Sequence, residues 1–232
     1  MTVSGKPARV MPARAAALAQ RRGSWAIWLV PPALILVAIV PMITGGLRLT
    51  QLGGGPAIMP EAARFTDFPL PVVAHIIAGV LFSLLGAFQF VPALRLGRRS
   101  WHRAVGVVLI PAGFVVALSA LWMASFSDLP PGDGPALLVI RWVFGAYMVL
   151  TLVLAVRALT QRRYATHGAW MTRAYALGIA AGTQAYVLIP GSILYGPDDQ
   201  VSRAIAMTIG WLINLGVAEL VIWRRKARRA RL

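Results

Sequence analysis

Apolar residues run through this chain in six long stretches, which are separated by short connections rich in polar residues, glycine and proline. The stretches cover residues 25–43, 70–94, 105–126, 136–159, 169–194 and 204–223. About 20 apolar residues in a helix are enough to cross the ~30 Å hydrocarbon core of a bilayer. The pattern therefore predicts an all-α, polytopic membrane protein with six transmembrane helices in a bundle.

Composition agrees with this assignment. Apolar residues make up 58% of the chain and charged residues 13%, whereas a soluble domain has about 25% charged residues. We expect one membrane domain, residues 25–223, between a basic, disordered N-terminal tail (1–24) and a basic cytoplasmic tail (224–232). The basic segment and the first apolar run are both too long for a cleaved signal peptide, so the first helix is expected to be retained.

The basic residues predict the orientation. In a six-helix topology, 18 of the 23 Lys and Arg residues fall on the side that holds both termini. The opposite side has Arg48, Arg64 and Arg203, and it also has six of the seven acids. Because Lys and Arg accumulate on the cytoplasmic side of membrane helices, both termini are predicted to be cytoplasmic. The net charge of +16 then indicates contact with anionic lipids at the basic tails, and no nucleic acid partner.

Several classes of chemistry are excluded or disfavoured. The chain has no cysteine, so it forms no disulfide, no covalent c-type haem attachment and no cysteine-ligated iron–sulfur cluster. Any cofactor must be held by histidine, methionine, carboxylate or backbone groups. Phosphate-binding glycine loops, the Gly-x-Ser-x-Gly elbow and His-Glu-x-x-His are absent from the sequence, which disfavours a membrane hydrolase.

Three histidines are the candidate ligands. His102 and His167 each follow a short arginine-containing connection and open an apolar stretch. They would therefore start at similar depth on the inner side, either as anchors of helix ends or as a pair of imidazoles that ligate one haem iron. His75 lies near the outer side, on a face with small or polar residues at three- and four-residue steps. That face suits close helix packing with a hydrogen-bonded histidine, or a flat cofactor.

Charged residues inside apolar stretches are costly unless they are paired. Arg173 and Glu219 both lie near the inner side, and a direct ion pair between them, which would stabilise helix docking, is the simplest expectation. Arg141 lies near the outer side at a depth like that of His75. It could meet a cofactor carboxylate or Asp67, or extend its head to the outer surface.

Several segments resemble the DUF2306 group of predicted bacterial membrane proteins. The run from His167 to Ala176, with Trp170, Met171, Arg173 and Tyr175, is similar to that group's His–x–x–Trp–Met–x–Arg–x–Tyr signature. His75 followed by 86–90, His102-Arg103-x-x-Gly106, and the set Trp211, Asn214 and Glu219 resemble its other patterns. The resemblance covers about residues 70–223 and implies a bacterial cytoplasmic (inner) membrane location.

The resemblance also implies an architecture like that of cytochrome b561, in which histidines on adjacent helices hold haem b. It would make His75, His102 and His167 candidate ligands and Arg173 a partner of a haem propionate, with a redox partner or quinone. Three histidines are one short of two bis-histidine haems, and Gln184 stands where the family more often has arginine. The alternative function is a non-catalytic small transporter or a structural helical subunit of a membrane complex.

Overall fold

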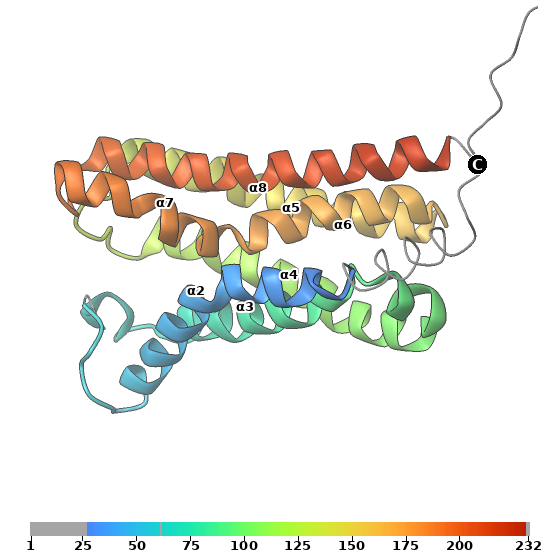
Figure 1. The fold of residues 1–232 in the computed structure, drawn as a ribbon. Helices are drawn as coiled ribbons and strands as arrows, with labels where there is room; N and C mark the ends of the chain where they lie inside the picture. The colour runs from blue at the N-terminus through green and yellow to red at the C-terminus, as the bar shows by residue number, and fades with distance from the viewer. Residues whose placement is uncertain (1–26, 61, 231–232) are drawn as a thin grey trace, which may run out of the picture.

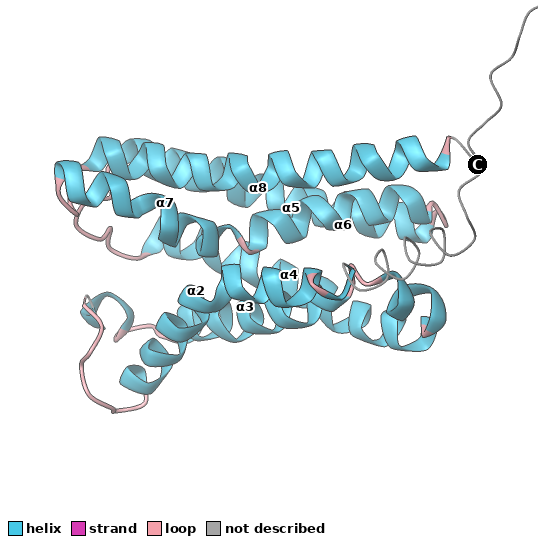
Figure 2. Cartoon of the chain, in the orientation of Figure 1, coloured by secondary structure: helices cyan, strands magenta, loops and turns pink. Residues whose placement is uncertain are grey.

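A computed structural model describes residues 27–60 and 62–230, and within them the chain forms helices and connecting loops only (Figure 2). The long helices are α2 (Val30–Leu52), α3 (Leu70–Phe88), α4 (Arg99–Phe126), α5 (Pro135–Thr160), α6 (Tyr164–Gly178), α7 (Ala180–Tyr195) and α8 (Gln200–Arg229). Short helical turns cover Ala62–Phe65 and Ala93–Gly97. The prediction of an all-helical protein is confirmed. The N-terminal tail 1–24 lies outside the described residues.

Five helices, α2, α3, α4, α5 and α8, are long and apolar enough to cross a membrane. Helices α6 and α7 together make a sixth span if the bent pair is counted as one. Large apolar side chains are exposed along these helices, among them Val107, Leu194 and Ile205. Such a surface is stable only against lipid, so the protein is a multi-pass membrane protein in contact with the bilayer.

Sequential spans run antiparallel when α6 and α7 are counted as one bent span, and α8 lies along α7 and α6 (Figure 1). The α3–α4 and α5–α6 connections and the end of α8 therefore lie at one end of the bundle, which we name the inner end after its predicted cytoplasmic position. The α2–α3, α4–α5 and α7–α8 connections lie at the other, outer end. The cytoplasmic location of the inner end itself stays a prediction.

The core is formed by α3, α4, α5 and α6. Phe82 of α3 is 1% exposed and packs with Leu152, Met148 and Tyr175. Glycines let these helices approach closely: a Cβ at Gly113 would lie 2.9 Å from the Phe82 ring, and one at Gly178 would lie 2.7 Å from it. This is the close packing of small residues that replaces the hydrophobic effect between helices in a membrane.

The C-terminal ends of three helices differ from the sequence prediction by six residues or more. Helix α2 continues to Leu52 rather than ending near residue 43, since its polar side chains are satisfied within the helix: Thr44 Oγ1 donates to Val40 O and Thr50 Oγ1 to Gly46 O. Helix α3 ends at Phe88, six residues early. Helix α8 continues through most of the basic tail.

The stretch 169–194 was expected to be one continuous helix, and it is broken instead. Helices α6 and α7 meet at Ile179 with a bend of 42°. The break does not coincide with Pro190, which lies inside α7. It lies where Gly178 and Ala180 are pressed into the core, so tertiary packing rather than proline sets its position.

Candidate functional site

His75 is held between α3 and α4. Its Nδ1 lies 3.1 Å from Val116 O and 2.9 Å from Ser119 Oγ. A carbonyl oxygen can only accept, so Nδ1 carries the proton and donates, which makes Nε2 the lone-pair nitrogen. The His75 side chain thus belongs to the packed interface between these two helices, in agreement with a hydrogen-bonded histidine at a close helix contact.

His102 and His167 both lie in the first turn of an inner-end helix. His167 Nδ1 donates to Ala155 O of α5 at 2.9 Å, which again makes Nε2 the lone-pair nitrogen. His102 is half-buried on α4, with its Nδ1 atom enclosed. Val116 is fourteen residues from His102 along α4, or about 20 Å at 1.5 Å per residue. His75 therefore lies in a different layer from the inner two histidines.

Haem b, which the resemblance to cytochrome b561 implies, is only partly matched by these side chains. An imidazole fixed through Nδ1 by a carbonyl is the usual form of an iron ligand, and His167 has that form. The small-residue face of α3, however, is filled: a Cβ on Gly86 would overlap the Tyr175 ring, and Tyr175 Oη donates to Ser83 O at 2.8 Å. Within the described residues no group of three or more His, Cys, Asp or Glu could hold a metal ion.

Arg173 and Glu219 lie at ion-pair distance near the inner end. Arg173 Nε lies 2.5 Å from Glu219 Oε1, and Nη2 lies 2.8 Å from Oε2. The Trp170 ring lies under the guanidinium, with its centroid 4.5 Å from Cζ. The guanidinium expected from the resemblance to meet a propionate is thus engaged by a carboxylate of α8.

A second polar cluster lies at the α6–α7 break, and we name Thr183, Gln184 and Asn214 the break cluster. Asn214 of α8 donates through Nδ2 to Ala176 O at 3.0 Å and accepts from Thr183 Oγ1 at 2.7 Å. Gln184 donates to Met207 O at 3.1 Å. In hydrocarbon, a carbonyl freed by a helix break must find a donor inside the protein, and Asn214 supplies that donor.

The outer end holds a charged cluster that was not expected. Asp133, in the α4–α5 loop, has no exposed side-chain area, and it forms ion pairs with Arg141 of α5 and Arg203 of α8. Arg203 Nε donates to Asp133 Oδ1 at 2.6 Å. The partner of Arg141 is thus Asp133 rather than Asp67. The loop is docked tightly, since Gly132 has φ +78° and a Cβ there would lie 2.9 Å from Asp198 Cα.

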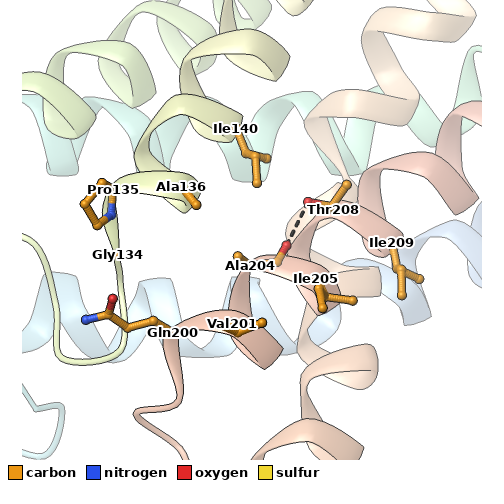
Figure 3. A pocket seen from close by; sticks show the side chains of 10 residues that line it. All are labelled: Gly134, Pro135, Ala136, Ile140, Gln200, Val201, Ala204, Ile205, Thr208 and Ile209. Carbon is orange, nitrogen blue, oxygen red and sulfur yellow. Dashed lines mark hydrogen bonds between the residues drawn. The ribbon is translucent and has the colours of Figure 1, made fainter.

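Two cavities flank the outer half of α8. The larger, about 450 Å³, is an apolar groove between α5 and α8. Figure 3 shows Ile140 on one side of this groove and Val201, Ile205 and Ile209 on the other. The smaller, about 270 Å³, lies between α7 and α8 and is lined by Ser192, Ser202 and Arg203. Neither of the two is lined by a histidine.

Sequence reasoning missed Asp133 and Arg203 because both lie in or beside loops, where a charge needs no explanation. One signal was available: Arg141 lies within an apolar stretch and therefore needs an acidic partner on the outer side. Six acids lie on that side, so the sequence could not identify which one pairs with it. Thr183 was missed because uncharged polar residues are common in membrane helices.

No curated protein and no solved structure matches this chain. One family model matches, that of the predicted membrane proteins DUF2306, over residues 72–222. The matched region runs from α3 to near the end of α8 and includes His75, His102, His167, Arg173 and Glu219. It leaves out all of α2. On this evidence the chain belongs to the DUF2306 family of predicted membrane proteins.

Proposed function

We propose that the protein is a small, non-catalytic transporter of the bacterial inner membrane, with its solute path along α7 and α8. The observation that carries this proposal is the break cluster. A membrane span that is interrupted mid-bundle and lined by uncharged polar side chains is the usual setting of a transporter's binding site. Thr183, Gln184 and Asn214 place donors and acceptors at that point, where they bond to one another and to the carbonyls of Ala176 and Met207. A solute would exchange for these bonds.

The attachment of α8 supports the same proposal. Helix α8 is tied at its outer end by Arg203 to Asp133 and at its inner half by Glu219 to Arg173. The two cavities lie beside its outer half, one between α5 and α8 and one between α7 and α8. Empty volume beside a helix leaves room for that helix to move.

The test uses the natural absence of cysteine. Thr183→Cys places one thiol in the break cluster, with little change in side-chain size. Ile213→Cys is the matched control, since Ile213 precedes Asn214 on α8 and is 44% exposed on the outside of the bundle. Each variant is treated, in right-side-out and inside-out membrane vesicles, with a charged methanethiosulfonate reagent that cannot cross the bilayer.

A transport path brings water to position 183 from at least one face, so Thr183→Cys should be labelled there while Ile213→Cys stays unlabelled from both. If neither thiol is labelled from either face, the transport proposal is refuted. A reagent that labels both equally would mean a loosened bundle, and would also count against a defined path.

A second candidate function is electron transfer through haem b, with a redox partner or quinone. It is favoured by His167, whose Nδ1 is fixed by Ala155 O so that Nε2 has a free lone pair. When bound, haem would supply one-electron chemistry, and His102 and His167 would hold it. The visible spectrum of the detergent-purified protein from haem-sufficient cells tests this. A Soret band that shifts on dithionite reduction and is lost in His167→Ala supports it, and a colourless protein refutes it.

A further inference from the structure

The smaller cavity, between α7 and α8, extends from the outer end of the bundle to the neighbourhood of the break cluster. Its α7 lining begins at Ala185, which directly follows Gln184, and ends at Gly196, which caps α7. Gly196 lies eleven residues after Ala185, or about 16 Å at 1.5 Å per residue. That is about half of the ~30 Å hydrocarbon core. The cavity therefore lies along the outer half of the proposed path between α7 and α8.

Among the described residues, Arg203 is the one charged residue that lines this cavity. Its Nε donates to Asp133 Oδ1 at 2.6 Å. A guanidinium has five N–H donors, and the four on Nη1 and Nη2 form no hydrogen bond to any described residue. Neither Nη atom is enclosed by protein, and the side chain is 27% exposed. These donors are therefore available to a molecule in the cavity.

The ion pairs around Arg203 leave a positive charge in excess. Asp133 is a single carboxylate that pairs with two guanidiniums, those of Arg141 and Arg203. The carboxylate of Asp199 caps the N-terminus of α8, and Asp198 is exposed, where solvent screens its charge. The wall of the cavity therefore favours an anionic group. The planar fork of a guanidinium fits the oxygens of a carboxylate or a similar oxyanion.

Two hydroxyl groups add acceptors to the same lining. Ser192 Oγ donates to Ile189 O at 2.9 Å, and Ser202 Oγ donates to Asp199 O at 3.3 Å. A hydroxyl has one hydrogen, so each oxygen is left as an acceptor for a group in the cavity. A cationic donor together with neutral acceptors matches a solute that has an oxyanion and also an N–H or O–H group.

We propose that this cavity is the outer binding site of the path, and that Arg203 there selects small solutes that carry an oxyanion and an N–H or O–H donor. The Nη groups of Arg203 bind the oxyanion, and the hydroxyl oxygens of Ser192 and Ser202 accept from the donor. The cavity volume of about 270 Å³ limits the solute to a small molecule. The role of this site in transport rests on the proposed function.

The test again uses the natural absence of cysteine. Ser192→Cys places a thiol in the cavity with little change in side-chain size. Ala57→Cys, at an exposed position of the α2–α3 loop, is the matched control. Right-side-out membrane vesicles are labelled with sulfonatoethyl methanethiosulfonate, which is itself an oxyanion, or with its positively charged trimethylammonioethyl analogue. The measured quantity is the ratio of the two labelling rates, anionic over cationic.

Three further changes are made in the Ser192→Cys chain. Arg203→Gln removes the guanidinium, Arg203→Lys keeps the charge without the fork of donors, and Arg48→Gln removes the same charge from α2 at the outer end. The ratio at Ser192→Cys should be about fivefold that at Ala57→Cys, the value for one positive charge about 9 Å away in water. It should fall to the control value with Arg203→Gln, and most of it should remain with Arg203→Lys and with Arg48→Gln.

Three results would overturn the selectivity. Equal ratios at Ser192→Cys and Ala57→Cys would mean that Arg203 does not act on a molecule in the cavity. An equal fall with Arg203→Gln and Arg48→Gln would mean that only the summed charge of the outer end matters. Failure of both reagents at Ser192→Cys would mean that lipid or protein closes the cavity. If Arg203→Gln does not fold, the comparison of Ser192→Cys with Ala57→Cys still decides.

Labelling of Thr183→Cys separates this inference from the transport proposal. A preference for the sulfonate at Ser192→Cys without any labelling of Thr183→Cys would leave an oxyanion site and remove the path. Labelling of Thr183→Cys without that preference would leave the path and remove the selectivity by Arg203.

Discussion

Arg173 and Glu219 join α6 to α8 through two parallel contacts, Nε to Oε1 at 2.5 Å and Nη2 to Oε2 at 2.8 Å. The fork of donors meets both carboxylate oxygens, which fixes the relative rotation of the two helices as well as their separation. The Trp170 ring lies under the guanidinium and restricts it further. Both residues lie within the matched family region.

Removing both partners of this pair should destabilise the protein by less than the two single removals added together. Arg173→Met leaves a carboxylate without its partner, at an expected cost of about 1–3 kcal/mol. The 51% exposure of the Glu219 side chain places the cost in the lower part of that range. Arg173→Met/Glu219→Leu should cost less than the sum of the single changes, as measured by unfolding in SDS titrations. Strictly additive effects would mean that the pair contributes nothing.

Removing the acid of the outer charged cluster should cost more stability than breaking the Arg173–Glu219 pair. Asp133 is fully buried between Arg141 and Arg203, so Asp133→Asn leaves two arginines facing each other. Breaking a buried charge pair costs about 3–5 kcal/mol, and we expect a clear fall in melting temperature in detergent. Asp128→Asn is the control, because Asp128 lies on the same loop and is exposed. A fall of the same size in both variants would argue against a specific role for Asp133.

Replacing a glycine by alanine should destabilise the protein at a helix contact and have little effect on the lipid-exposed face. A Cβ on Gly182 would overlap the carbonyl oxygen of Val37 in α2, and a backbone atom cannot rotate away. Gly182→Ala should therefore cost about 1–3 kcal/mol. A Cβ on Gly216 would meet nothing within 4 Å, so Gly216→Ala should be neutral or stabilising by up to about 1 kcal/mol. Unfolding measurements that rank the two in the opposite order would contradict the α2–α7 packing.

The orientation in the membrane is a separate prediction. The basic residues concentrate at the inner end, which predicts a cytoplasmic C-terminus. A reporter that works only in the cytoplasm should therefore be active when it is fused after Leu232. Alkaline phosphatase, which is active only in the periplasm, should remain inactive at that position. It should be active when it is inserted after Gly132 in the α4–α5 loop. Periplasmic activity of the C-terminal fusion would invert the assignment.

The sequence by itself determined that the chain is an all-helical, multi-pass membrane protein with five to six spans, and it predicted the orientation. These properties depend on local hydrophobicity and on the charges beside each span, because every backbone group in lipid must be satisfied within its own helix. The same locality explains why the pairing of Arg173 with Glu219 could be expected: both are charged, both lie at one depth, and the inner half offers few other partners.

Tertiary structure alone decided the rest. The sequence does not reveal that Asp133 rather than Asp67 meets Arg141, since six outer acids were available and only the docking of the α4–α5 loop against α8 selects one. Nor does it place the break at Ile179, because the cause is packing of Gly178 against Phe82 on another helix. The contacts of Arg225 with Thr172 and Phe90 likewise depend on which helices meet at the inner end. That arrangement comes from shape complementarity across the bundle, which local sequence patterns do not encode.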